Sequence, residues 1–129
     1  MSVNDIQIGG KHYKKAGEFQ HWDWVEDNGV RYLEGCATKY VARNRFKNAT
    51  PIEDLEKARH YIDKMIERHS AGVYSVRPYL VNSVPLAKAY VLTPREADIV
   101  DAIVNWKDVN DLRKAQADID VLIAYHKGE

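Results

Sequence analysis

The chain has 129 residues, its 19 Lys and Arg are balanced by 19 Asp and Glu, and its 45% hydrophobic content suits one domain with a buried core. Zero net charge excludes a strongly basic nucleic-acid-binding protein, and the single cysteine, Cys36, excludes an internal disulfide and fits a reducing compartment. Because no apolar run approaches the ~20 residues that span a bilayer, and the polar N-terminus lacks the apolar segment of a signal peptide, we expect a cytoplasmic protein.

The first part of the chain is expected to form an extended arm and two helices. Residues 1–17 form the arm, since Gly9-Gly10 interrupts regular structure. A short aromatic-rich helix is expected over about 19–27, ended by Asn28-Gly29, because both residues tolerate positive φ. A second helix is expected over about 32–45. Its buried stripe at helical spacing comprises Leu33, Ala37, Tyr40 and Val41.

A long helix is expected over about 51–69. Thr50 suits the N-cap, Pro51 suits the first helical position, and Glu53 stands at the spacing of a capping box. Apolar residues then recur at helical spacing and predict an inward-facing stripe. This stripe comprises Ile52, Leu55, Ala58, Ile62, Met65 and Ile66.

Residues 71–92 differ in character, with β-branched and aromatic residues set among Pro78 and Pro85. Prolines in such a segment favour edges and turns over a central strand. We therefore expect either an extended crossover or a short β-hairpin over about 73–92.

Two more helices are expected, over about 94–106 and from 108 to about 126. Thr93-Pro94-Arg95-Glu96 repeats the start signal seen at Thr50. The apolar positions expected to face inward in these two helices are Ala97, Val100, Ile103, Val104, Val109, Leu112, Ala115, Ile119, Leu122 and Ile123.

The last helix resembles the long central helix, which predicts an internal repeat. Residues 51–69 align with 108–126 without a gap, and the preceding helices align if the second loop is shortened. The matched pairs include Asp54/Asp111, Leu55/Leu112, Lys57/Lys114, Ala58/Ala115, Ile62/Ile119, Ala37/Ala97, Ala42/Ala102 and Phe46/Trp106. The alternative is that two amphipathic helices merely share a composition.

This pattern predicts a mainly α fold with two helical hairpins, residues 18–70 and 93–129, packed as a small bundle. A hairpin that cannot cover its own apolar face packs against a second one or dimerises through that face. We therefore also expect a homo-oligomer, with sites that could form between protomers.

Three groups of residues follow one another in the first half of the chain. They are Gly9–Lys14 in the arm, Leu33–Arg43 in the second helix and Glu53–Ile62 in the third. Together, from Ile8 to Arg68, they resemble a phage-encoded family labelled nucleotide kinase or left as a domain of unknown function. Cys36 departs from the family, which usually has Asn there, and the second half of the chain lies outside the usual match.

The resemblance implies a helical bacteriophage protein, active in the cytoplasm of the infected bacterial cell, that binds a nucleotide or a nucleotide-derived small molecule. The candidate phosphate ligands are cations inside the resembling motifs. Lys39 and Arg43 are four residues apart and share a helix face, Lys47 lies four further on, and Lys57 could approach from the next helix. From spacing alone a solvated helix face is the simpler interpretation; the position inside the motif favours phosphate binding.

The arm supplies further candidate ligands. His12, Tyr13 and Lys14 could fold over a bound phosphate, and the backbone of Gly10 could approach it closely. The backbone of Gly35, in the second helix, is a candidate of the same kind.

Tyr40 and Tyr61 are candidates for base stacking or sugar contact, with core packing as the alternative. Asp54 could orient a lysine, contact a sugar hydroxyl or hold a metal, or simply favour the start of its helix. The histidines show no metal-ligand spacing, so no dedicated metal site is expected.

Three functions remain open. The first is a nucleoside monophosphate kinase that uses ATP with Mg²⁺. It would lack a P-loop, because no G-x-x-x-x-G-K-[ST] sequence occurs, and its catalytic residues cannot be assigned. The second is a non-catalytic sponge that sequesters a cyclic-nucleotide or ADP-ribose-type immune signal and so blocks anti-phage defence. The third is a helical adaptor for a host protein.

Overall fold

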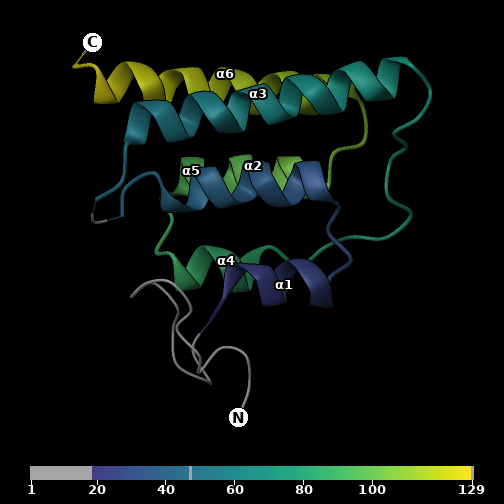
Figure 1. Ribbon diagram of the computed structural model, residues 1–129, viewed down its shortest axis with the longest axis horizontal. Helices are drawn as coiled ribbons and strands as arrows, with labels where there is room; N and C mark the ends of the chain where they lie inside the picture. The colour runs from purple at the N-terminus through teal and green to yellow at the C-terminus, as the bar shows by residue number, and fades with distance from the viewer. Residues whose placement is uncertain (1–18, 47, 129) are drawn as a thin grey trace, which may run out of the picture.

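The computed structural model describes residues 19–46 and 48–128, and this part of the chain is helical, with no strand (Figure 1). The expected mainly α bundle is confirmed. The helices are α1 (His21–Asp27), α2 (Tyr32–Arg43), α3 (Pro51–Ser70), α4 (Val84–Ala89), α5 (Pro94–Val104) and α6 (Val109–His126). None of these helices is both long and apolar enough to cross a membrane.

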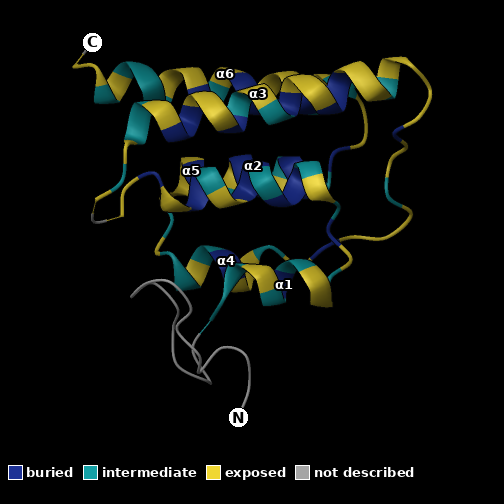
Figure 2. Ribbon diagram, in the orientation of Figure 1, coloured by how far each residue is buried: buried dark blue, intermediate teal, exposed yellow. Residues whose placement is uncertain are grey.

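The helices lie in three layers. In Figure 1, α3 and α6 form the upper layer, α2 and α5 the middle layer, and α1 and α4 the lower layer. The middle layer is therefore covered on both faces. This explains why α2 and α5 bury a larger share of their residues than the outer helices, as Figure 2 shows by colour.

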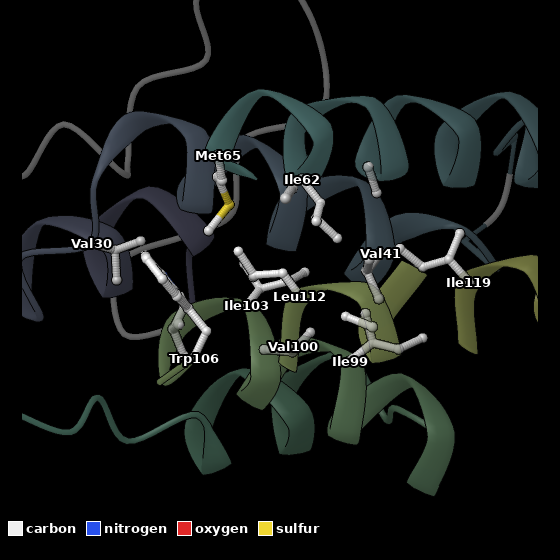
Figure 3. Close-up of a cluster of buried hydrophobic side chains, with 14 of the residues drawn as sticks. Val30, Val41, Ile62, Met65, Ile99, Val100, Ile103, Trp106, Leu112 and Ile119 are labelled. Atoms are coloured by element: carbon white, nitrogen blue, oxygen red, sulfur yellow. The ribbon is translucent and has the colours of Figure 1, made fainter. Parts of the chain in front are cut away.

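The expected apolar stripes meet in one core between the upper and middle layers (Figure 3). Most of the predicted inward positions are buried, whereas Leu33, Tyr40, Ile52, Ala97, Val109, Leu122 and Ile123 are half-buried. Burial of a Leu- or Ile-sized side chain contributes about 1.5–3 kcal/mol, so this core dominates the stability of the fold. The buried residues include Val41, Leu55, Ile62, Met65, Ile99, Ile103, Leu112 and Ile119.

The two expected capping boxes behave differently. At α5 the Thr93 side chain accepts a hydrogen bond from the Glu96 amide at 3.2 Å, and Glu96 accepts one from the Thr93 amide at 2.8 Å. At α3 the expected box is wrong, because the Thr50 side chain makes no cap hydrogen bond. Its hydroxyl turns instead to the Asp54 carboxylate, 3.4 Å away.

The crossover contains no hairpin in the described structure. Residues 73–83 run without regular structure, and the expected extended segment then ends in the short helix α4, which the sequence analysis missed. A start signal was present, since Ser83 precedes Pro85 in the first turn and the helix-forming residues 86–89 follow. The helix was not predicted because the β-branched and aromatic residues of 73–92 favoured an extended segment or a hairpin.

The repeat extends over three helices in each half. A short, a medium and a long helix follow in the same order, with 7, 12 and 20 residues in the first half and 6, 11 and 18 in the second. Buried positions of α3 and α6 coincide in the predicted register, for example Ile62 with Ile119. In α2 and α5 they coincide when Glu34 is paired with Glu96, so the predicted pairing of Ala37 with Ala97 was two residues out of register.

Contacts between the halves are reciprocal. Arg59 of α3 donates to Asp120 of α6 at 2.9 Å, and Gln116, at the position of α6 equivalent to Arg59, donates to Asp63 of α3 at 2.7 Å. A contact from i to j that is repeated from j to i is the signature of a two-fold axis. The two halves are therefore related by an approximate internal two-fold axis.

A buried glutamate near the start of each middle helix joins the halves. Glu34 and Glu96 are both 0% exposed. Arg77 donates to Glu34 at 2.6 Å, and Arg45 donates to Glu96 at 2.7 Å. Each arginine also donates to a backbone carbonyl in the turn before its glutamate's helix, Arg77 to Gly29 and Arg45 to Val91. Both carbonyls belong to residues in the left-handed conformation.

This pairing explains the two helix ends that differ from the predicted ones. α2 ends at Arg43 rather than Arg45, because Arg45 turns away to bind Glu96. α5 ends at Val104, because Trp106 leaves the helix and donates its indole N–H to Glu34 at 3.3 Å.

Candidate functional site

The candidate site lies on the outer face of the α2–α3 hairpin. Burial of Ala37 and Val41 turns the opposite side of α2 to solvent, where Lys39 and Arg43 are exposed. Lys57 of α3 is also exposed and lies beside them. The structure thus brings together three of the four cations that the sequence singled out; Lys47 lies outside the described residues.

The three cations converge on one aromatic ring. The Lys57 ammonium lies 5.3 Å from the centre of the Tyr40 ring, the Lys39 ammonium 5.6 Å, and the Arg43 guanidinium carbon 5.9 Å. Each distance is within the range of a cation–π interaction. The negative face of one tyrosine therefore partly offsets the repulsion among three positive charges and holds them close together.

Asp54 closes one end of this cluster. Its side chain is 3% exposed, its Oδ2 lies 3.9 Å from Arg43 Nε, and that oxygen has no hydrogen-bond partner among the described residues. A buried carboxylate oxygen left unpaired is costly. Its ion-pair partner is the Arg43 guanidinium, and the oxygen is shielded from solvent, so a ligand would reach it only if Arg43 moved aside.

Lys57 forms only a weak ion pair within the protein itself. Lys57 pairs with Glu53 at 3.1 Å, but both side chains are exposed, and the hydrogen bond that Lys57 donates to Glu53 raises the pKa of Lys57. Exposed ion pairs of this kind are weak. Lys57 thus stays protonated at neutral pH and can exchange Glu53 for the oxygen of a ligand.

A row of three tyrosines runs along the same face. Tyr40 and Tyr61 are nearly parallel, with ring centres 6.0 Å apart and an interplanar angle of 12°, and Tyr32 meets Tyr61 edge-on at 6.4 Å. Tyr40 and Tyr61 are half-buried and pack against the core, so they are rigidly placed while keeping one side accessible. Core packing and ligand contact are compatible at both positions.

The sequence analysis missed Tyr32 and Cys36 as members of this face. Tyr32, Cys36 and Tyr40 follow at intervals of four residues in α2, and this spacing would have placed them in one line. Interaction with the Cys36 thiol raises the pKa of the Tyr32 hydroxyl and, with burial, raises that of Tyr61 to about 12. Both hydroxyls therefore keep their protons at neutral pH.

His21 lies beside the cluster without adding charge to it. Its Nε2 is 3.0 Å from the Thr38 hydroxyl, and burial together with the positive charge of Lys39 lowers its pKa to about 4. The imidazole is neutral at neutral pH, so it neither repels the cations nor attracts a phosphate.

Other predicted site residues have a different place. Gly35 is buried inside the hairpin, and Val25 of α1 lies 3.5 Å from where its Cβ would be. Its amide and carbonyl are both hydrogen-bonded within the chain, so its observed role is packing. Gly10, His12, Tyr13 and Lys14 lie outside the described residues.

A surface depression occurs in the second half. It has a volume of about 570 Å³, is open to solvent, and lies between α4 and α5. Its charged lining comprises Lys88, Asp98 and Asp101, so carboxylates outnumber cations there. This depression is therefore a poor phosphate site.

Metal chemistry built by the protein alone is not indicated in the described part of the chain. Residues 19–46 and 48–128 contain no group of three or more His, Cys, Asp or Glu side chains placed to hold a metal ion.

All of the convergent residues fall in one segment of the sequence. Residues 8–63 match the model of a family, DUF3310, that is described as a protein of unknown function. The DUF3310 segment contains α1, α2 and the first part of α3, and so carries the cations, the tyrosine row, Cys36 and Asp54. No curated protein matches the chain, and no solved structure does so either.

Proposed function

We propose that this protein binds the phosphate groups of a nucleotide, or of a nucleotide-derived small molecule, on the α2–α3 face. The observation that carries the proposal is the convergence of Lys39, Arg43 and Lys57 on the Tyr40 ring within 6 Å. Arg43 offers a planar fork for two phosphate oxygens and the lysines offer movable point charges. A polyanion would relieve the mutual repulsion of the three cations.

A binding role without turnover is the form that this geometry favours best. The described face has one cationic cluster, which suits one chain of phosphates, whereas a kinase must hold a donor and an acceptor together. In this form the protein would be a sponge for a nucleotide immune signal, and Cys36 in place of the usual Asn and the duplicated hairpin favour binding over turnover.

Phosphoryl transfer is the second candidate, and Asp54 is the observation that favours it. Its buried Oδ2 has no hydrogen-bond partner and lies 3.9 Å from Arg43, so it could accept a proton from an attacking phosphate or hydroxyl once Arg43 turns to the ligand. The reaction would pass the γ-phosphoryl group of ATP to a nucleoside monophosphate, giving ADP and a nucleoside diphosphate. Lys39 and Arg43 would neutralise the group in transit.

Calorimetric titration tests the binding proposal directly. We expect the protein to bind at least one member of a panel of nucleoside mono-, di- and triphosphates, cyclic nucleotides and ADP-ribose. We expect Arg43→Ala and Lys57→Ala each to weaken that binding about tenfold or more, because each removes a charge-assisted contact. Absence of binding across the panel would reject the proposal and favour the adaptor alternative.

Matched variants separate the site from general charge effects. Lys64 lies on the same helix as Lys57, is 49% exposed against 47%, and pairs with Glu67 at the same distance of 3.1 Å. Arg95 is 47% exposed against 45% for Arg43. Lys64→Ala and Arg95→Ala should bind like the wild type.

Incubation with ATP and Mg²⁺ distinguishes the two candidate functions. Chromatographic recovery of a tight ligand unchanged supports sequestration. Conversion of a monophosphate to a diphosphate supports the kinase, and Asp54→Asn should then abolish conversion while leaving binding within about twofold.

A further inference from the structure

The tyrosine row extends well beyond the three cations. Tyr32, the first residue of α2, lies eight residues before Tyr40, which corresponds to about 12 Å along the helix. It is 74% exposed, yet its edge contact with Tyr61 holds the ring in place. An exposed aromatic held by a neighbouring ring is an available stacking surface.

The chemistry of the row changes along its length. The Tyr40 end lies beside several positive charges. At the other end, the described side chains that shift the pKa of Tyr32 are Cys36, Tyr40 and Tyr61, none of which is a cation. Because the pKa of the Tyr32 hydroxyl is raised, it remains neutral and can donate a hydrogen bond. One end therefore suits phosphates and the other suits a neutral, planar group.

We propose that Tyr32 is the platform on which the base of the nucleotide stacks, with its phosphate chain extended along α2 to Lys39, Arg43 and Lys57. This inference rests on the proposed function and adds an orientation and a size to it. The span of about 12 Å matches an extended nucleoside di- or triphosphate and exceeds the reach of a monophosphate. The ligand class is therefore a nucleoside polyphosphate.

The second half of the molecule shows that the scaffold does not require this row. At the positions equivalent to the tyrosines and Cys36, the described structure has small, cyclic or acidic residues. The replacements are Pro94 for Tyr32, Asp98 for Cys36, Ala102 for Tyr40 and Asp118 for Tyr61. The row thus belongs to the outer face of the first half alone, where the cations also lie.

The test compares nucleotides with an inorganic anion that has no base. The four common ribonucleoside triphosphates, their monophosphates and inorganic tripolyphosphate are titrated by calorimetry into the wild type and into Tyr32→Ala. Removal of a stacking ring should weaken triphosphate binding about tenfold and leave tripolyphosphate binding unchanged. The wild type should bind triphosphates more tightly than monophosphates.

Three further variants identify the cause of any loss. Tyr125→Ala removes a tyrosine of equal exposure, 74%, from α6 and should bind like the wild type. Tyr32→Trp keeps a stacking surface and should restore triphosphate affinity. Arg43→Ala should weaken triphosphates and tripolyphosphate alike, and thermal melting of each variant shows whether it is folded.

The outcomes separate this inference from the proposal on which it rests. If Tyr32→Ala weakens tripolyphosphate as much as triphosphate, or weakens neither, the stacking platform is rejected while the phosphate site stands. If monophosphates bind as tightly as triphosphates, the extended orientation is rejected. If neither tripolyphosphate nor any nucleotide binds the wild type, the proposed function fails and the inference fails with it.

Discussion

The first and second halves of the molecule bury equivalent positions and expose different chemistry. Ile62 and Ile119 are both fully buried, and Glu34 and Glu96 are both buried and bound to an arginine. On the outer face, by contrast, Asp101 stands at the position of Lys39 and Asp118 at that of Tyr61.

This difference assigns separate tasks to the two halves. Each hairpin covers the apolar face of the other, so both must contribute their buried residues to the shared core. The outer face of the second half does not contribute to this core, so carboxylates there do not disturb packing. We conclude that the second half stabilises the fold, while the first half, with the DUF3310 segment, carries the candidate site.

Truncation of the paired core isoleucines should have the largest effect. Ile62→Ala and Ile119→Ala each leave a cavity in a fully buried position and should lower the free energy of unfolding by about 2–5 kcal/mol. Chemical denaturation measures both values. A cost confined to Ile62 would show that the second half contributes little, contrary to the two-fold arrangement.

Loss of the charge on Glu96 should have the next largest effect. Glu96→Gln removes the ion pair with Arg45, and because Arg45 is 41% exposed we expect a loss of about 1–2 kcal/mol at pH 7. Burial raises the pKa of Glu96, but hydrogen bonds from Arg45, Thr93 and Asn44 outweigh burial and lower the pKa below 4.5.

The lowered pKa also predicts a pH dependence. A carboxyl group whose folded pKa is depressed contributes stability above its unfolded pKa and loses it as the pH falls through its folded pKa. The wild type should therefore lose stability below about pH 4.5, and Glu96→Gln should lose less. Melting temperatures between pH 7 and pH 3 measure the difference; parallel curves would contradict the assignment.

Substitution of the residues two positions after the ends of α1 and α4 should have smaller effects, of opposite sign. Gly29 and Val91 both have positive φ, +61° and +51°. Val91 is 77% exposed and β-branched, so Val91→Gly should relieve strain and stabilise by about 1 kcal/mol. Gly29→Ala should destabilise, because a side chain is strained at this φ and its Cβ would also displace the Tyr79 hydroxyl, 2.6 Å away. Destabilisation by Val91→Gly would show that the Val91 side chain makes a contact worth more than the strain.

Substitution of the threonines that precede α5 and α3 should have the smallest effect on stability. Thr93 caps α5 through its side chain and Thr50 does not cap α3. Thr93→Ala should cost about 1 kcal/mol and Thr50→Ala clearly less. Equal losses in urea denaturation would show that Thr50 contributes to stability in another way, through its hydrogen bond to Asp54.

The cations were predictable from the sequence because their spacing is local. Lys39 and Arg43 are four residues apart on one helix, and that interval alone places them on one face. Tyr32 and Cys36 have the same interval, but no local rule shows that Tyr61, from another helix, lies between Tyr32 and Tyr40. The stacking geometry required the packing of α2 against α3.

The sequence by itself determined the main helices, their apolar stripes and most of their ends, because helical periodicity and start signals act over a few residues. Only the tertiary structure decided that α2 ends early, that Thr50 does not cap, and that two buried glutamates join the halves. Glu34 and Trp106 are 72 residues apart, and Glu96 and Arg45 are 51 apart. Such partners meet only after the core has formed, and they add to the local contacts that offset the cost of burying each carboxylate.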